Sequence, residues 1–187
     1  MPTPPPHAVI GVLLAAGAGR RYGMPKVLAH EGDWLRLAVR ALLEGGCFRV
    51  IVVLGAADTP VPQAAEAIYA PDWREGASAS LRAGLAAASR DPRAEFAAIH
   101  LVDTPDVHGD VVSRVVAAAL AGESGIARAY FDDRPGHPVV LARDHWAAVS
   151  DMATGDEGAR PYLRKHAGRV QRVDCSDLAT GADQDTR

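Results

Sequence analysis

Short apolar runs alternate along the chain with longer segments in which apolar residues recur every three or four positions. The runs over residues 8–13 and 49–55 are rich in β-branched residues, which predicts strands that are buried on both sides, and the later runs are also expected to form strands. The recurring segments have the period of amphipathic helices. The expected strands are residues 8–13, 49–55, 97–102, 126–131, 137–141 and 170–173. The expected helices are residues 34–44, 61–68, 111–120 and 161–166, with a further helix that ends near residue 88.

This order predicts a parallel sheet, because a strand, a helix and a second strand at this spacing form a right-handed crossover. In such sheets ligands bind at the carboxyl ends of the strands. Residues 14–26 directly follow the first strand, so they are expected at that edge. Asp33 is placed to cap the helix over 34–44, and Gly45 and Gly46 are placed to end it.

Composition narrows the class of protein. The 187 residues suit one domain with a sizeable core, and a net charge of −3 gives no basic excess for binding a nucleic acid. Cys47 and Cys175 lack the spacing of a disulfide framework or a zinc site, so a reduced cytoplasm is the simplest setting. No apolar run approaches the length of a membrane span. Residues 1–6 predict a disordered proline-rich tail without the apolar core of a signal peptide, which leaves 7–187 as a single domain.

The most informative stretch, residues 14–26, has the composition of a phosphate-binding loop. Three glycines allow a sharp turn and a close approach of backbone N–H groups to an anion, while two arginines and a lysine supply positive charge. A Rossmann fingerprint does not fit, because the third glycine, Gly23, comes one residue late. A Walker loop does not fit either, because Lys26 lies between Pro25 and Val27.

This stretch resembles the signature of the MobA-like nucleotidyltransferases, L-x-[AG]-G-x-G-x-R-x-G-x-P-K. The positions that match are Leu14, Gly17, Gly19, Arg21, Gly23, Pro25 and Lys26. The opening Leu-Ala-Ala-Gly is more similar to the branch that makes molybdopterin cytosine dinucleotide than to the guanylyl branch, which usually has a second glycine. The alternative is a glycine-rich turn with surface cations.

The resemblance implies roles for this loop. Nucleotide binding falls to backbone N–H groups in the loop and to a serine further along, and the positions concerned are Leu14, Ala15, Ala16, Gly17, Gly19 and Ser80. Arg21 and Lys26 are implied as catalytic cations that stabilise the triphosphate. The Ala16 methyl is expected to narrow the space beside the base, which favours CTP over GTP.

Residues 71–85 resemble the family's W-x-x-G-x-x-x-S-L-x-x-G block, which frames the nucleoside. Ser78 or Ser80 is placed to cap a helix, whose free N–H groups would suit polar atoms of a nucleotide. The alternative is an ordinary capped helix with Trp73 packed beneath it. Ala70 departs from the family, which often has asparagine there.

Two acids are implied as magnesium ligands. Asp103 ends a buried strand in a D-x-P element, which is the family's metal-binding element, although Thr104 is an unusual middle residue. Alternatively, Asp103 caps a helix or forms an Asx turn. Asp185 matches the second acid of the family's terminal D-x-D-T, with Asp183 as the competing candidate. A solvated, frayed tail is the alternative for both.

The second substrate is assigned to residues in two later blocks. His137 lies in a G-H-P-V element of the family, although a histidine here can simply brace a turn. Asp156 and Arg160 lie in a G-D-x-G-A-R loop that is similar to that of the cytidylyltransferases. Arg160 is free to pair with an anion, unless it forms a surface pair with Asp156.

The resemblance covers nearly the whole chain in five blocks. It implies an α/β, three-layer, Rossmann-like fold with a mostly parallel sheet and a small antiparallel excursion. It also implies Mg²⁺-dependent transfer of CMP from CTP to a phosphorylated acceptor, molybdopterin, with release of pyrophosphate and with a molybdoenzyme or its chaperone as partner. The alternatives are transfer of GMP, a sugar phosphate or other acceptor, and a nucleotide-binding module without turnover.

Overall fold

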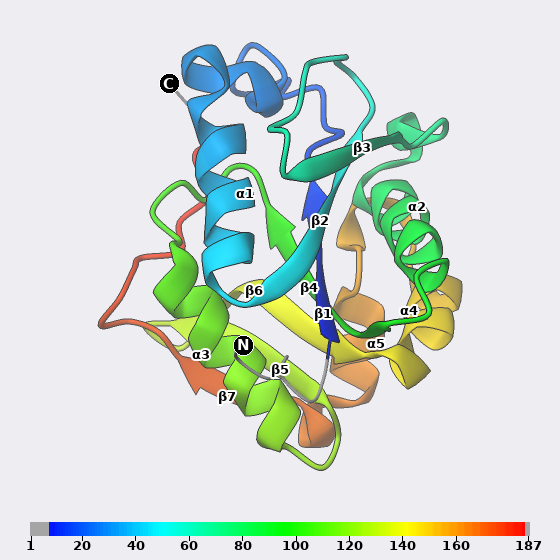
Figure 1. The fold of residues 1–187 in the computed structure, drawn as a ribbon, viewed down its shortest axis with the longest axis vertical. Coiled ribbons are helices and arrows are strands. Elements are labelled where there is room, and N and C mark those ends of the chain that lie inside the picture. Colours follow the sequence, from blue (N-terminus) through cyan, green and yellow to red (C-terminus); the bar gives the residue numbers. More distant parts are fainter. Residues whose placement is uncertain (1–7, 186–187) are drawn as a thin grey trace.

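The computed structural model describes residues 8–185, so the proline-rich tail expected over residues 1–6 lies outside the described part. A seven-stranded sheet runs through it in the order β3-β2-β1-β4-β6-β5-β7 (Figure 1). The strands are β1 (Ala8–Leu14), β2 (Cys47–Leu54), β3 (Ala65–Tyr69), β4 (Ala94–Leu101), β5 (Ile126–Phe131), β6 (Arg134–Ala142) and β7 (Gln171–Asp174).

The central strands are β1, β2 and β4, as their apolar composition predicts. β1 lies between the other two and pairs with both in parallel, so that Val12 is opposite Ile51 on one side and Ile99 on the other. Of the strands in the described residues, β6 alone runs in the opposite direction, antiparallel to β4 and to β5. The predicted α/β fold, a mostly parallel sheet with a small antiparallel part, is therefore confirmed.

Helices cover both faces of the sheet (Figure 1). One core is formed under α1 and α3, and the other under α2, α4 and α5. The helices are α1 (Asp33–Glu44), α2 (Ala77–Ser89), α3 (Gly109–Ala121), α4 (Trp146–Met152) and α5 (Arg160–Lys165). Three layers result, and α4 is the helix that the sequence pattern did not predict.

In residues 8–185, no helix has the length and apolar character needed to cross a membrane.

The helix expected over residues 61–68 was wrong, because its second half forms the edge strand β3. Alanine and glutamine favour a helix locally, but Ala65 is opposite Val50 and Tyr69 is opposite Leu54 in a parallel ladder. Pairing satisfies the backbone along the open edge of β2, which outweighs a weak local preference. Most of β3 is at the surface, so its sequence has no long apolar run that would indicate a strand.

The start of α1 also differs from the expectation. Gly32, with a φ of +82°, is the N-cap residue, and Asp33 is the first residue of the helix. The Asp33 carboxylate pairs with Arg36 and makes no capping hydrogen bond. The carboxylate still lies in the first turn, where a negative charge interacts favourably with the helix dipole.

The strand order sets the position of a ligand site. The chain passes from β1 to β2 on one side, while β4 lies on the other side of β1. In a parallel sheet this reversal opens a crevice at the carboxyl ends of the strands. The loop after β1 and the segment 102–106 after β4 meet at this edge, since Val102 N donates to Leu14 O at 3.3 Å.

Candidate nucleotide site

The loop after β1 is held in one shape by backbone hydrogen bonds. Ala15 N donates to Val53 O at 3.0 Å, and Gly23 N closes a turn on Gly19 O at 2.8 Å. Gly19 has a φ of +59°, and a Cβ there would overlap the carbonyl oxygen of Met24. A glycine is therefore required at this position on conformational and steric grounds.

The geometry of the loop alters the set of donors expected for a nucleotide. The N–H group of Ala15 is already used by β2, so it is not available to a ligand. Leu14 is the last residue of β1 and lies at the entrance to the loop. Gly17 is exposed, and a Cβ built there meets nothing within 4 Å, which leaves open space beside the backbone. The segment from Gly17 to Gly19, which is exposed or partly exposed, is thus the part of the loop that is open to a ligand.

Beside this loop, Lys26 joins two carboxylates from distant parts of the chain. Its ammonium group donates to Asp103 Oδ2 and to Asp185 Oδ1, each at 2.7 Å. Arg21 approaches the other oxygen of Asp185, with 3.2 Å between Arg21 Nη2 and Asp185 Oδ2. The Lys26 side chain is 13% exposed and that of Asp103 19%, whereas Arg21 is 79% exposed. The inner pair is therefore shielded from water, which strengthens its electrostatic interactions.

These contacts keep the lysine charged. Burial opposes the charge of Lys26, but the hydrogen bonds to Asp103 and Asp185 more than offset burial and raise the pKa of Lys26. The hydrogen bond from Lys26 in turn lowers the pKa of Asp185. The site therefore holds the Lys26 ammonium group between the carboxylates of Asp103 and Asp185, with the exposed Arg21 guanidinium at its outer side.

The acids at this point suit a hard divalent cation. Asp103 Oδ1 is buried and has no hydrogen-bond partner in the described part of the chain, while Asp103 Oδ2 and Asp185 Oδ1 converge on Lys26. Desolvation and the carboxylates of Asp103 and Asp185 raise the pKa of Asp183, which is evidence of a third acid nearby. No group of three or more His, Cys, Asp or Glu side chains able to hold a metal occurs within residues 8–185. Two carboxylates fit a Mg²⁺ ion that is shared with substrate phosphates and water.

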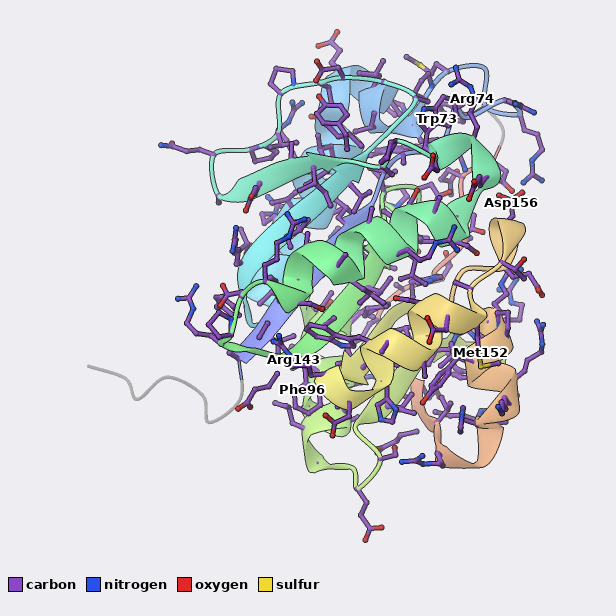
Figure 2. The ribbon with its side chains drawn as sticks, turned by 90° about the vertical axis from the view of Figure 1, so that its right-hand side faces the viewer. Trp73, Arg74, Phe96, Arg143, Met152 and Asp156 are labelled. Atoms are coloured by element: carbon purple, nitrogen blue, oxygen red, sulfur yellow. The ribbon has the colours of Figure 1, made fainter. Side chains whose placement is uncertain are left out.

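The start of α2 differs from the expectation that Ser78 or Ser80 caps it. Gly76 is the N-cap residue, and both serines are buried within the helix. The Asp156 carboxylate accepts a hydrogen bond from Ala77 N at 3.3 Å, and Ser78 Oγ accepts one from Gly158 N at 3.2 Å. The loop before α5 therefore closes over the start of α2, where Figure 2 shows Asp156. Asp156 is engaged with this helix and not with Arg160.

Ala16 is less open to a ligand than its place in the loop suggested. Its side chain is 3% exposed. A Cβ at Gly55 would lie 2.8 Å from Ala16 Cβ and 2.6 Å from Trp73 Cβ, so these residues pack tightly together. The Ala16 methyl group therefore packs against protein and does not itself narrow a pocket for the base.

Of the three candidate residues for the second substrate, His137 on β6 and Arg160 at the start of α5 lie near each other, whereas Asp156 lies at the start of α2. Burial, followed by the charges of Arg128, His100 and Arg160, lowers the pKa of His137 to about 3, so its imidazole is uncharged at neutral pH. Arg128, which the sequence reasoning missed, lies on β5 and donates from Nε to Gly136 O at 3.1 Å. Burial also lowers the pKa of Arg128, yet this guanidinium has no carboxylate partner within residues 8–185. A half-buried cation that lacks a carboxylate partner is typical of an anion-binding site.

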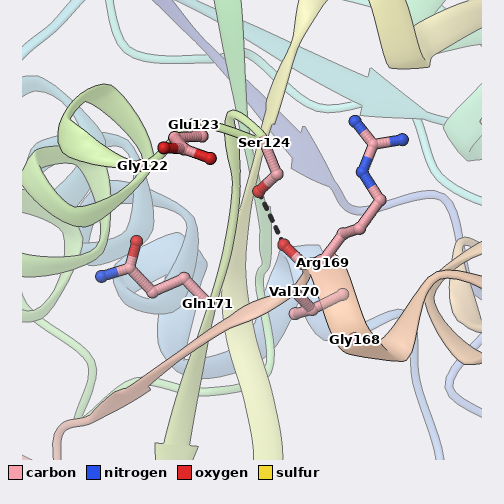
Figure 3. Close-up of a pocket in the computed structure, with 7 residues that line it drawn as sticks. All are labelled: Gly122, Glu123, Ser124, Gly168, Arg169, Val170 and Gln171. Atoms are coloured by element: carbon pink, nitrogen blue, oxygen red, sulfur yellow. Dashed lines mark hydrogen bonds between the residues drawn. The ribbon is translucent and has the colours of Figure 1, made fainter.

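A hollow of about 500 Å³ lies at the opposite edge of the sheet, where β5 and β7 begin (Figure 3). Residues of its wall include Glu123, Ser124 and Gln171. The Ser124 hydroxyl donates to Arg169 O at 2.6 Å, so this polar pair is already satisfied. The hollow is remote from the loop after β1, and it contributes nothing to the nucleotide site.

Comparison with known proteins agrees with this geometry. The family model described as "MobA-like NTP transferase domain" matches residues 11–170. Nicotine blue oxidoreductase of Paenarthrobacter nicotinovorans is 38% identical over 191 residues, which cover 95% of this chain and 92% of that protein.

Solved structures give the same picture. Rv0371c from Mycobacterium tuberculosis H37Rv is 28% identical, with a TM-score of 0.76 over 96% of this chain and 94% of that chain. A complex of Rv0371c with manganese has a TM-score of 0.70 at 26% identity, over 89% of this chain and 88% of that one. A nucleotidyl transferase from Methanothermobacter thermautotroptrophicus shares the fold, with a TM-score of 0.79 at 18% identity over 96% and 92% of the two chains. The chain therefore belongs to the MobA-like NTP transferase family.

Proposed function

We propose that this protein transfers CMP from CTP to a phosphorylated acceptor and releases pyrophosphate, the acceptor being molybdopterin. The observation that carries the proposal is the position of Lys26 between Asp103 and Asp185, beside the loop after β1. Phosphoryl and nucleotidyl transfers need little covalent chemistry from the protein and depend on positioning and on neutralisation of charge. A cation and two acids at the mouth of a glycine loop supply these functions.

In this proposal different residues of the chain bind the triphosphate, neutralise its charge and hold the metal. N–H groups between Ala16 and Gly19 hold the triphosphate, and Lys26 and Arg21 neutralise charge that moves to the pyrophosphate as it leaves. Asp103 and Asp185 would hold Mg²⁺, which when bound screens the phosphate oxygens from one another and orients them. The acceptor phosphate attacks the α-phosphorus, the bond to the β,γ-pyrophosphate breaks, and the nucleotide becomes linked to the acceptor.

We expect kcat/KM for CTP to exceed that for GTP. The expectation rests on Ala16 and on the loop over residues 155–160, whose sequences are similar to those of the cytidylyltransferase branch. Because Ala16 is buried, the discrimination is expected to be partial, about 1–3 kcal/mol. The choice of nucleotide and the choice of acceptor are both tested by measuring pyrophosphate release with each nucleoside triphosphate against a panel of phosphorylated acceptors. Equal or faster turnover of GTP would point to a guanylyltransferase, and turnover of a sugar phosphate to another acceptor.

The acceptor phosphate is assigned to a group of residues near β6, which consists of the uncharged imidazole of His137 and two cations, Arg160 and the newly identified Arg128. Replacing Arg128 by Gln is expected to raise KM for the acceptor about ten- to a hundredfold and to leave KM for the nucleotide unchanged, since a charge-assisted hydrogen bond is worth about 1.5–3 kcal/mol. Arg172 on β7 serves as the matched control, because it already pairs with Asp133 at the surface. An increase in KM for the nucleotide instead would place Arg128 on the triphosphate side.

Oxidoreduction is the second candidate, because the relative at 38% identity is a nicotine blue oxidoreductase. A hydride transfer has no pyrophosphate leaving group whose charge must be neutralised. It therefore does not account for the cluster of Lys26 with two carboxylates. The two activities are separated by one comparison: the absorbance of nicotine blue is followed with a nicotinamide dinucleotide, and pyrophosphate release is followed with CTP. If neither proceeds and CTP still binds, the protein is a nucleotide-binding module without turnover.

A further inference from the structure

The last described part of the chain, residues 175–185, is called here the C-terminal segment. It contains no helix or strand, yet it returns along α3 to the carboxyl edge of the sheet (Figure 1). Its end places Asp185 on Lys26, and Gln184 N donates to Asp103 O at 2.9 Å. A carboxylate at the end of an irregular segment reaches such a contact only if something upstream sets its register.

Asp106 supplies one such constraint. Its Oδ2 atom accepts hydrogen bonds from Thr180 N at 2.7 Å, from Thr180 Oγ1 at 2.6 Å and from Gly181 N at 3.3 Å. A carboxylate has only acceptors, so it matches three converging donors, and hydrogen bonds to a charged group are stronger than neutral ones. Asp106 stands three residues after Asp103, so one short turn carries both the acid of the site and the anchor of the segment.

Gly181 supplies a second constraint, independent of Asp106. Its φ is +61°, and a Cβ there would overlap the ring of Phe131, which is 2% exposed and cannot give way easily. The C-terminal segment therefore packs against the buried Phe131 ring at Gly181. Asp185 follows four residues later, and a shift of one residue in an extended chain moves a side chain by about 3.3 Å. That displacement exceeds what the 2.7 Å contact with Lys26 tolerates.

We propose that Asp106 and Gly181 are positioning residues, which fix the register of the C-terminal segment so that Asp185 meets Lys26 and Asp103. The inference rests on the proposed function, in which Asp103 and Asp185 share a metal ion. Neither positioning residue touches the substrate in this scheme. Their effect reaches the site through Asp185.

A double-mutant cycle tests this coupling. Mn²⁺ binding is measured from the electron paramagnetic resonance signal of the free ion for the wild type, Asp106→Ala, Asp185→Asn and the double variant. Asp106→Ala is expected to weaken Mn²⁺ binding about tenfold, as loss of partners beyond the ligands commonly does. In the Asp185→Asn background the same change is expected to add nothing, because the residue that it positions is already disabled. Losses that add, or wild-type binding by Asp106→Ala, overturn the proposal.

Further variants separate positioning from general damage. Gly181→Ala is expected to weaken Mn²⁺ binding like Asp106→Ala, while Asp106→Asn, which keeps one acceptor oxygen, is expected to recover part of it. Asp177→Ala is the control, because Asp177 pairs with Arg114 in the same segment but away from the register contacts. Equal losses in Asp177→Ala would indicate a general loosening of the segment and would contradict the specific role.

Hydrogen exchange distinguishes failure of this inference from failure of the proposed function. The Gln184 amide donates to Asp103 O, so its exchange reports the register directly. Asp106→Ala is expected to accelerate its exchange, while the Val12 amide in the central sheet stays protected. Unchanged exchange at Gln184 overturns the positioning role. Faster exchange together with wild-type Mn²⁺ binding by Asp185→Asn supports that role and removes Asp185 from the proposed metal site.

Discussion

Replacing Lys26 by Met is expected to lower kcat/KM for nucleotidyl transfer at least about a hundredfold, which corresponds to 2–3 kcal/mol of lost transition-state stabilisation. Methionine keeps most of the length of the side chain and removes its charge. The reason for the size of the effect is burial: the Lys26 side chain is 13% exposed, so water cannot replace the ammonium group near the phosphates. The measurement is pyrophosphate release with CTP and the acceptor that supports turnover by the wild type.

Lys165→Met is the matched control, because Lys165 is the only other lysine in the chain and is exposed in the last turn of α5. It is expected to behave like the wild type. Thermal unfolding of Lys26→Met should be followed with and without Mn²⁺, because the variant leaves Asp103 and Asp185 without the cation that they share. Near-normal turnover by Lys26→Met would remove the lysine from the catalytic group.

Replacing Asp103 by Asn is expected to reduce kcat about a thousandfold, or roughly 4 kcal/mol, and to raise the metal concentration needed for half-maximal activity. Asparagine keeps the shape and one acceptor oxygen but loses the negative charge that a divalent cation requires. Asp103 is expected to have the larger effect of the two proposed ligands, since its side chain is 19% exposed and that of Asp185 is 38% exposed.

Asn substitutions at Asp183 and Asp185 complete this series, with activity followed against Mg²⁺ concentration. Asp151→Asn, on the exposed face of α4, is the control for loss of a surface charge. If Asp103→Asn alone changes the metal dependence, the shared metal site is wrong and the C-terminal acids serve another purpose. Unchanged metal dependence in Asp103→Asn would contradict the assignment of the metal to this strand end.

Much of the fold was predictable because the pattern and the tertiary environment agree. The apolar runs within β1, β2 and β4 are largely buried, as their hydrophobic composition indicates. The helix over 61–68 failed because β3 is an exposed edge strand, where composition carries little information about burial. The helix predicted over residues 34–44 was confirmed as α1, although its capping residue was placed one position late.

The candidate site divides in the same way. The loop after β1 could be found in the sequence, because a sharp turn and a close backbone approach require glycines at fixed intervals. Arg128 could not be found, since a single arginine within a strand carries no signal until its surroundings show that no carboxylate of residues 8–185 pairs with it. Asp156 was assigned to a substrate, but folding brings it to the start of α2, where its carboxylate accepts a hydrogen bond from Ala77 N.

Local chemistry fixed the strands, the glycine turn and the charged residue types, because these depend on neighbours within a few positions. The meeting of Lys26 with Asp103 and Asp185 depends on contacts across 77 and 159 residues, which no local pattern encodes. The sequence left open whether the end of the chain is frayed. In the folded chain Asp106 accepts hydrogen bonds from Thr180 and Gly181, and the Phe131 ring lies against Gly181, so the position of Asp185 follows from packing at a distance.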